Sequence, residues 1–177
     1  MINPINVKLT QAEIAKARQA SALRYQMNRV SGIEDKLVDT ARHGSEADLP
    51  GIKAEMAVSK LLELPFDPWA LGVDSGCDLF IDCGDSEVGV QVKSTHSKNA
   101  KYMLGPPGAK SNWDVAVFVR PTIKDALVEV YGWITASDYK EKLQELDLGH
   151  GPTKGVSINE MRSMEELWRF INVKRSS

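Results

Sequence analysis

The hydrophobic pattern changes its period within residues 51–93, from the spacing of a helix to the alternation of strands. Apolar residues recur on one side of the predicted helix, at Ile52, Met56, Leu61 and Leu62. Pro65 ends this helix because proline cannot continue its hydrogen bonding, so the sequence predicts a helix over Gly51–Leu64. Turn-forming residues separate the three strand candidates that follow it: Trp69–Val73, Asp78–Asp82 and Val88–Lys93.

Two nearly continuous apolar runs, Val115–Val119 and Leu127–Ile134, predict buried or half-buried strands later in the chain. Helical stretches are predicted at Ser137–Leu146 and Ser163–Ile171. The glycines and prolines of residues 94–112 and 149–155 predict loops, and the first of these has room for a short helix before its prolines. At 177 residues the chain fits one hydrophobic core. We therefore expect an α/β domain with a central mixed β-sheet flanked by helices.

The first part of the chain reads as helical. Thr10 and Glu13 have the spacing of a capping box. The apolar residues that follow have helical spacing: Ile14, Ala17, Leu23, Met27 and Val30. The outer face of this helix is basic and suits either phosphate contacts or plain solvation: Lys16, Arg18, Arg24 and Arg29. With a second helix around Glu34–Arg42, residues 1–50 are expected to form a helical N-terminal segment. It packs on or extends from a core of residues 51–177, as an arm or a dimerisation element.

The composition, 42% hydrophobic and 26% charged, is that of an ordinary globular protein. No apolar run approaches the roughly 18 residues of a membrane helix, and the polar start lacks the pattern of a secretory signal. We therefore expect a cytoplasmic protein, in a bacterial or virus-infected cell, with no membrane partner. Cys77 and Cys83 are expected to be reduced packing residues. Neither a phosphate-binding P-loop nor a serine-hydrolase motif is present in the sequence.

Acidic and basic residues are separated along the chain. Residues 46–87 hold ten acids and two lysines, whereas residues 88–113 hold four lysines and no acid. A metal-dependent nuclease needs concentrated carboxylates next to lysines that bind phosphate. Solvated side chains that cluster by chance would give the same pattern, so the choice depends on the motifs.

Three features of chemical interest fall within about forty residues. Strand alternation places Gln91 and Lys93 on the same face, where both can point into one cleft. Asp78 heads the preceding strand, and a hairpin can bring its carboxylate to the side of Gln91 and Lys93. Glu55 can be supplied by the helix packed on this sheet. The four residues together form a candidate phosphodiesterase site.

Hydrolysis of a phosphodiester requires a positioned water and stabilisation of negative charge on the phosphoryl oxygens. Mg²⁺, with Mn²⁺ as an alternative, suits this site because it takes oxygen ligands and needs only one or two carboxylates. Asp78 would be the principal ligand, completed by the Gln91 side-chain oxygen, the Val92 carbonyl and Glu55. Lys93 would contact the phosphate or orient the attacking water, and a nearby metal would favour loss of its proton.

This arrangement resembles the PD-(D/E)xK nuclease superfamily, in the variant with glutamine in the second half-motif. The resemblance covers roughly Gly51–Lys93 and implies a restriction-endonuclease-like core, a Mg²⁺-dependent deoxyribonuclease activity and DNA as partner. Under it Asp78 is the metal-binding aspartate, Gln91 and Lys93 form the second half-motif, and Glu55 is the helical glutamate. Cys77 stands where the name-giving motif has proline, and Gln91 is a neutral ligand.

Alternatives remain open at several positions. Asp74 competes with Asp78 as a ligand but lies in a turn-forming sequence. His96 could contact a phosphate or be a solvated loop residue. Three lysines are expected to line the path of the nucleic acid: Lys98, Lys101 and Lys110. Because Gln91 carries no charge, a weak or inactive nuclease fold that acts as a DNA-binding or assembly module is the second hypothesis. A homodimer or higher homo-oligomer is compatible with either.

Overall fold

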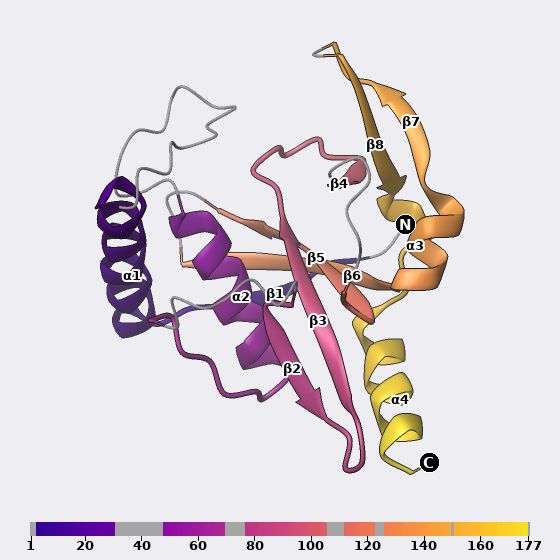
Figure 1. The fold of residues 1–177 in the computed structure, drawn as a ribbon, viewed down its shortest axis with the longest axis horizontal. Helices are drawn as coiled ribbons and strands as arrows, with labels where there is room; N and C mark the ends of the chain where they lie inside the picture. The colour runs from indigo at the N-terminus through magenta and orange to yellow at the C-terminus, as the bar shows by residue number, and fades with distance from the viewer. Residues whose placement is uncertain are drawn as a thin grey trace.

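The computed structural model describes residues 3–30, 48–69, 77–105, 112–122, 126–149 and 151–176. These residues form an α/β fold in which a five-stranded sheet is flanked by helices (Figure 1). The predicted helix at Glu34–Arg42 lies outside the described residues, as do Asp74, Lys110 and all but Trp69 of the first predicted strand. None of the described helices is long and apolar enough to cross a membrane.

The main sheet is mixed, as predicted, with the strand order β1-β6-β5-β3-β2. Its strands are β1 (Ile5–Lys8), β2 (Leu79–Asp82), β3 (Glu87–Ser94), β5 (Val115–Pro121) and β6 (Leu127–Thr135). β3 and β5 are parallel, whereas the other neighbours are antiparallel. The four strands from β2 to β6 that belong to this sheet match predicted ones within a few residues. The edge strand β1 was not predicted.

Alternation along β5 separates two cores on opposite faces of the sheet. Val115, Val117 and Val119 belong to the larger core, whereas Ala116 and Phe118 belong to the smaller one. This division matters for the site, because parallel pairing places Ala116 beside Gln91 and Phe118 beside Lys93. Gln91 and Lys93 therefore lie on the face of the smaller core.

Helices α2 (Leu49–Leu61) and α4 (Met164–Arg175) contribute to the larger core. α2 begins two residues before the predicted Gly51 and ends before the predicted Leu64. Glu63 has a left-handed φ of 54°, which breaks the helix just ahead of Pro65. Both helices thus confirm predicted elements, with shifted ends.

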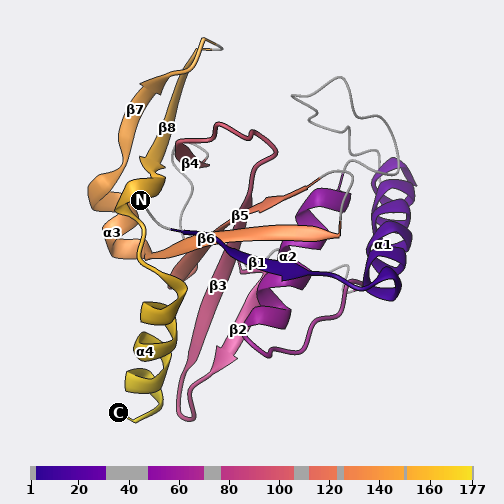
Figure 2. The ribbon, with the colours of Figure 1, turned by 180° about the vertical axis from the view of Figure 1, so that it is seen from behind.

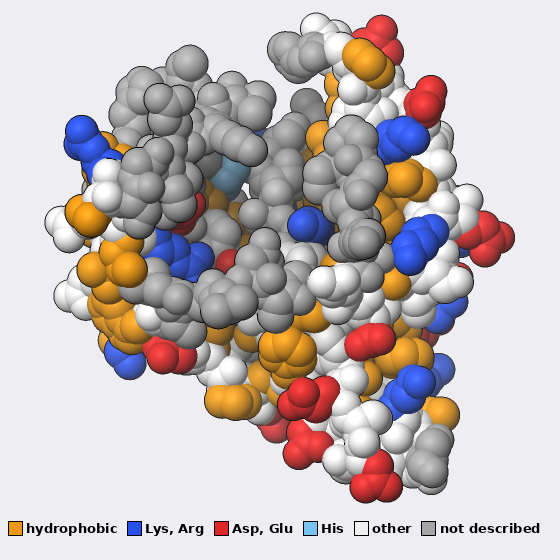
Figure 3. Space-filling view, in the orientation of Figure 1, with side chains coloured by type: hydrophobic (Ala, Val, Ile, Leu, Met, Phe, Trp, Pro, Cys, Tyr) orange, Lys and Arg blue, Asp and Glu red, His pale blue; other side chains and the backbone are white. Residues whose placement is uncertain are grey.

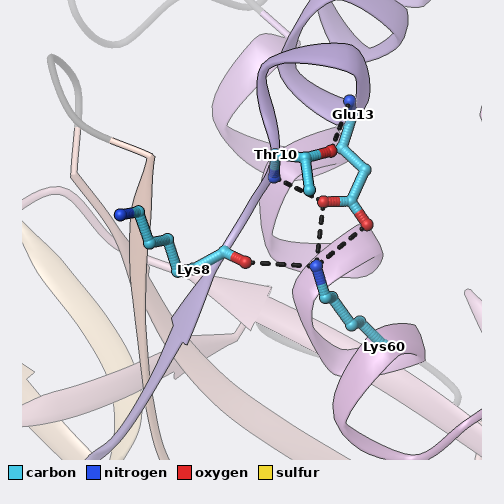
Figure 4. Close-up of polar contacts among 4 residues, drawn as sticks. All are labelled: Lys8, Thr10, Glu13 and Lys60. Atoms are coloured by element: carbon cyan, nitrogen blue, oxygen red, sulfur yellow. Dashed lines mark hydrogen bonds and ion pairs between the residues drawn. The ribbon is translucent and has the colours of Figure 1, made fainter.

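Helix α1 (Gln11–Val30) lies outside α2 in both ribbon views (Figures 1 and 2). The predicted capping box is present, since Thr10 and Glu13 exchange backbone-to-side-chain hydrogen bonds. Lys60 of α2 donates to both carboxylate oxygens of Glu13, at 3.1 and 3.0 Å, and to the Lys8 carbonyl at 3.2 Å (Figure 4). These contacts join the start of α1 to β1 and α2.

The packing of α1 is restricted to its first part. Ala17 and Ala20 are buried, but Met27 and Val30, which the sequence placed on the apolar side, are 44% and 89% exposed. Two small side chains allow the close approach of α2, and the helix then runs past the core. The predicted apolar side is therefore wrong for the second half of α1.

A second, three-stranded sheet of order β4-β8-β7 packs on the smaller core and was not predicted. Its strands are β4 (Tyr102–Gly105), β7 (Gln144–Asp147) and β8 (Pro152–Ser157), followed by a short 3-10 helix at Ile158–Glu160. β4 and β8 replace predicted loops, and β7 replaces the second half of the helix predicted at 137–146, which is limited to α3 (Ala136–Lys142). Figure 2 shows β7 and β8 projecting beyond the main sheet.

The glycines of this second sheet explain why loops were predicted there. A side chain at Gly105 would meet the Tyr139 hydroxyl at 2.1 Å, and one at Gly155 would meet Leu104 and Leu146 at 3.0 Å. These glycines leave room for neighbouring side chains, a role that local sequence does not distinguish from turn formation.

Candidate active site

Asp78 lies directly before β2, opposite Gln91 of β3. Its backbone N–H donates to the Val90 carbonyl at 2.9 Å, next to the paired residues Leu79 and Val90. One carboxylate oxygen, Oδ2, accepts the side-chain amide N–H of Gln91 and the backbone N–H of Val92, the latter at 2.6 Å. The structure therefore brings three of the predicted site residues into direct contact.

The end of β3 extends beyond its pairing with β2. Pairing between these strands starts at Leu79 and Val90, so residues 92–94 of β3 have no β2 residue opposite them. The N–H and C=O of one strand residue point to the same side, so the Val92 carbonyl also faces this edge. Asp78, Gln91 and Val92 thus meet where the pairing of β2 and β3 ends, with two N–H groups directed at the Asp78 carboxylate.

Glu55 lies on α2, the helix that packs on the larger core. Its side chain is 17% exposed and forms an ion pair with Arg24 of α1 at 3.7 Å. Burial raises the pKa of Glu55 to about 7, and the charges of Asp78 and Asp48 raise it too, while Arg24 opposes them. The influence of Asp78 on this pKa shows that the two carboxylates act on each other electrostatically.

Lys93 lies two residues beyond Gln91 and on the same face of β3. It is half-buried and forms part of the wall of a cavity of about 330 Å³. Lys101 lines the same cavity, so one of the lysines predicted to contact nucleic acid is brought close to Lys93. Lys98 is exposed on the intervening loop, and His96 is half-buried there and is not part of the cavity wall.

Several contributors to the site escaped sequence reasoning. Arg24 was assigned to the outer face of its helix, but it is half-buried and pairs with Glu55. Asp114 accepts the Gly89 N–H at 2.7 Å, and its own N–H donates to the Gly89 carbonyl at 2.9 Å, which fixes β3 beside β5. The position of Asp114 at the head of an apolar strand is the same signal that identified Asp78.

The two cysteines are free thiols, in agreement with the predicted packing role. Cys83 is buried, and the Cys77 thiol donates to the Asn112 carbonyl at 3.2 Å. Burial raises the pKa of Cys77, as do the nearby charges of Asp114 and Asp78. Cys77 is therefore a weakly acidic thiol that packs beside the site.

The donor set fits a hard cation with few protein ligands. Among the described residues there is no cluster of three or more histidine, cysteine or acidic side chains. A site for Zn²⁺ would need such a cluster. Mg²⁺ usually keeps several waters and is held by one or two carboxylates, which Asp78 and Glu55 can supply.

The chain has no match among protein-family models, curated proteins or solved structures. The geometry of the site therefore carries the functional argument alone.

Proposed function

We propose that this chain is a Mg²⁺-dependent nuclease that hydrolyses phosphodiester bonds in DNA on a restriction-endonuclease-like core. The observation that carries the proposal is the contact of Asp78 with Gln91 and Val92, where the pairing of β2 and β3 ends. Glu55, whose pKa the charge of Asp78 helps to raise, would supply a second carboxylate, and Lys93, on the same strand face as Gln91, would supply a cation. The mixed sheet and the helix that carries Glu55 support the same proposal.

Asp78, the Gln91 side-chain oxygen, the Val92 carbonyl and Glu55 would hold the metal. Gln91 turns its amide nitrogen toward Asp78, so metal binding would require the amide to rotate and present its oxygen. A bound Mg²⁺ supplies Lewis-acid stabilisation of the charge that develops on the phosphoryl oxygens. Glu55 would be a better ligand above pH 7, where its carboxyl group is ionised.

In the reaction, the oxygen of a water molecule forms a bond to phosphorus while the bond from phosphorus to the leaving ester oxygen breaks. The water loses a proton and the leaving oxygen takes one, so the products are a phosphate monoester end and a hydroxyl end. Lys93 would hold a non-bridging phosphate oxygen or orient the water. Its place on a strand, beside Phe118, gives it a fixed position.

The test is cleavage of plasmid and linear DNA in Mg²⁺ or Mn²⁺ by Asp78→Asn and Lys93→Met. Asparagine keeps the shape of Asp78 and can still accept the Val92 N–H, so folding is preserved while the charge is lost. We expect each substitution to slow cleavage by at least about 100-fold, the lower end of the effect of a positioned catalytic group.

Asp82→Asn, at the other end of β2, and Lys174→Met, on α4, are the matched controls and should leave cleavage unchanged. Wild-type protein that cleaves DNA in neither metal, or variants as active as wild type, would refute the nuclease proposal.

The second candidate function, a DNA-binding or assembly module of the same fold, is favoured by one observation. Gln91 is neutral, and its amide N–H donates a hydrogen bond to the Asp78 carboxylate. This hydrogen bond needs no metal. In that case wild-type protein would bind DNA, show no heat of Mg²⁺ binding by calorimetry and cleave nothing.

A further inference from the structure

A cavity lies beside Lys93, and the contacts of Asp78 with Gln91 and Val92 are not part of its wall. The proposed metal site therefore does not explain what the cavity is for. The cavity measures about 330 Å³ and is walled by the end of β3, the loop after it, β4 and neighbouring residues. Figure 3 shows this face of the molecule hollowed between α1 and the β7–β8 strands.

The lining combines three kinds of group. Lys93 and Lys101 supply positive charge, and hydroxyl and amide groups supply hydrogen-bond donors and acceptors: Ser94, Thr95, Ser97 and Asn99. Tyr102 supplies an aromatic ring. Leu104 and Leu148, which are 44% and 46% exposed, add an apolar surface to this wall.

The wall is fixed by hydrogen bonds at three points along the loop after β3. The Thr95 N–H donates to the Val119 carbonyl at 3.0 Å, and Arg120 donates to the Lys98 carbonyl at 2.8 Å. The Lys101 carbonyl accepts the Ile158 N–H at 2.9 Å. Arg120 is itself held by an ion pair with Glu129 on β6, so the cavity is formed before any ligand arrives.

We propose that this cavity binds one unpaired nucleotide of a DNA strand, next to the phosphodiester that is cut. A nucleotide carries a phosphate for the lysines, a base edge for the hydroxyl and amide groups, and a flat face for Tyr102 and the leucines. The volume lies at the lower end of the range for small-ligand pockets, about 300–1,000 Å³, and does not admit a duplex. The proposal rests on the proposed nuclease function and defines its substrate as single-stranded DNA or an unpaired end.

The test measures binding without cleavage. A fluorescent 12-nucleotide single strand and a duplex of the same length are titrated with the full chain in Ca²⁺ and in EDTA, and anisotropy is read. Ser97→Trp fills the cavity from an exposed position, since Ser97 is exposed and only its backbone takes part in the hydrogen bonds with Thr95 and Ala100. Ser86→Trp, at the exposed β2–β3 turn, is the matched control.

Wild-type protein should bind the single strand at least about tenfold more tightly than the duplex, and Ser97→Trp should remove about that factor, a typical contribution of base stacking. Ser86→Trp should change neither affinity. Binding of a deoxynucleoside monophosphate by wild-type protein that does not prefer the single strand over the duplex would assign the cavity to a free nucleotide and overturn the proposal. Equal loss of single-strand and duplex binding in Ser97→Trp, or no loss, would also overturn it.

The two proposals can fail separately. If Ser97→Trp weakens single-strand binding but the protein never cleaves DNA, the proposal for the cavity stands and the nuclease proposal is refuted. If cleavage depends on Asp78, but wild type and Ser97→Trp both cut single strands and duplexes at equal rates, the nuclease proposal stands and the proposal for the cavity is refuted.

Discussion

Gln91 donates its side-chain amide to Asp78, the residue directly opposite it in the hairpin of β2 and β3. The hydrogen bond forms because one partner is a carboxylate, which accepts, and the other is an amide, which donates. Two carboxylates in the same positions would repel each other unless a cation lay between them. If the proposed metal site is correct, the contact links the stability of the hairpin to its affinity for the metal.

Gln91→Glu should accordingly lower the unfolding temperature in EDTA and raise the stabilisation that Mg²⁺ brings. We expect a loss of about 1 kcal/mol without metal, the scale of opposed like charges in a sheet. An added carboxylate ligand should tighten Mg²⁺ binding about tenfold, worth about 1.4 kcal/mol at saturating metal. Differential scanning fluorimetry with and without Mg²⁺ measures both effects. Gln144→Glu, at the exposed start of β7, is the control, and an equal response of the two variants to Mg²⁺ would contradict the prediction.

Glu55 should make the stability of the protein fall as the pH rises from about 4.5 to about 7. Its pKa is about 7 in the folded protein and 4.5 ordinarily, so in this interval the folded state keeps a proton that the unfolded chain releases. The cost to the folded state is on the order of 3 kcal/mol above pH 7 and vanishes below pH 4.5. Glu55→Gln removes the titrating group, so its advantage over wild type should grow through this window and then level off.

Urea unfolding at pH 4.5, 6 and 8 measures that advantage, with Glu87→Gln at the exposed start of β3 as the control. If the free energies of unfolding of wild type and Glu55→Gln differ by the same amount at all three pH values, the pKa of Glu55 is not raised in the folded protein.

Gly89 should be intolerant of a side chain because a Cβ atom there would lie 2.5 Å from the Cys77 sulfur. Gly89→Ala should cost about 1–3 kcal/mol of the free energy of unfolding, as overpacking does. Cys77→Ala removes the sulfur and should recover most of this loss, giving a clear coupling in a double-mutant cycle. Gly51→Ala is the control, since nothing lies within 4 Å of its Cβ position and alanine favours the helix. Independent effects of the Gly89 and Cys77 substitutions would disprove the contact.

The lysines after β3 should contribute to the salt dependence of DNA binding. Replacing Lys98, Lys101 and Lys110 by glutamine should reduce the slope of log affinity against log salt by roughly 2–3, at about 0.7–0.9 per phosphate contact. Titrations between 50 and 200 mM salt, the approximate range over which such slopes are large, measure it. Lys8, Lys140 and Lys174 form the control triple, which should leave the slope as it is; the same change in both triples would mean a diffuse effect of net charge.

The sequence was sufficient for the local geometry of the site. The alternation in β3 places Gln91 and Lys93 on one face whatever the rest of the chain does, and the short turn that follows β2 sets Asp78 opposite Gln91. These features depend on neighbours in sequence. The α/β class and the mixed sheet followed from the same periodicities.

The contacts between distant segments were not accessible in this way. Arg24 meets Glu55 only because α1 packs on α2. The hydrophobic pattern of neither helix predicts that the two helices pack together. β4 and β8 were missed because Gly105 and Gly155 leave room for Tyr139 and Leu146 of other elements, and β7 was missed because it follows α3 within a stretch predicted as one helix. The cavity wall is built from these segments, so it could not be anticipated either.

The parallel pairing of β3 with β5 has a further consequence for how such a site can vary. Because β5 starts beside Val90 and runs in the same direction as β3, the chain must travel back along the sheet before β5 can begin. That return path starts just after Lys93 and carries both the loop of the cavity wall and β4. Substitutions or insertions there would change the wall of the proposed binding cavity while the five paired strands keep their register, so under that proposal substrate preference and fold can evolve almost independently.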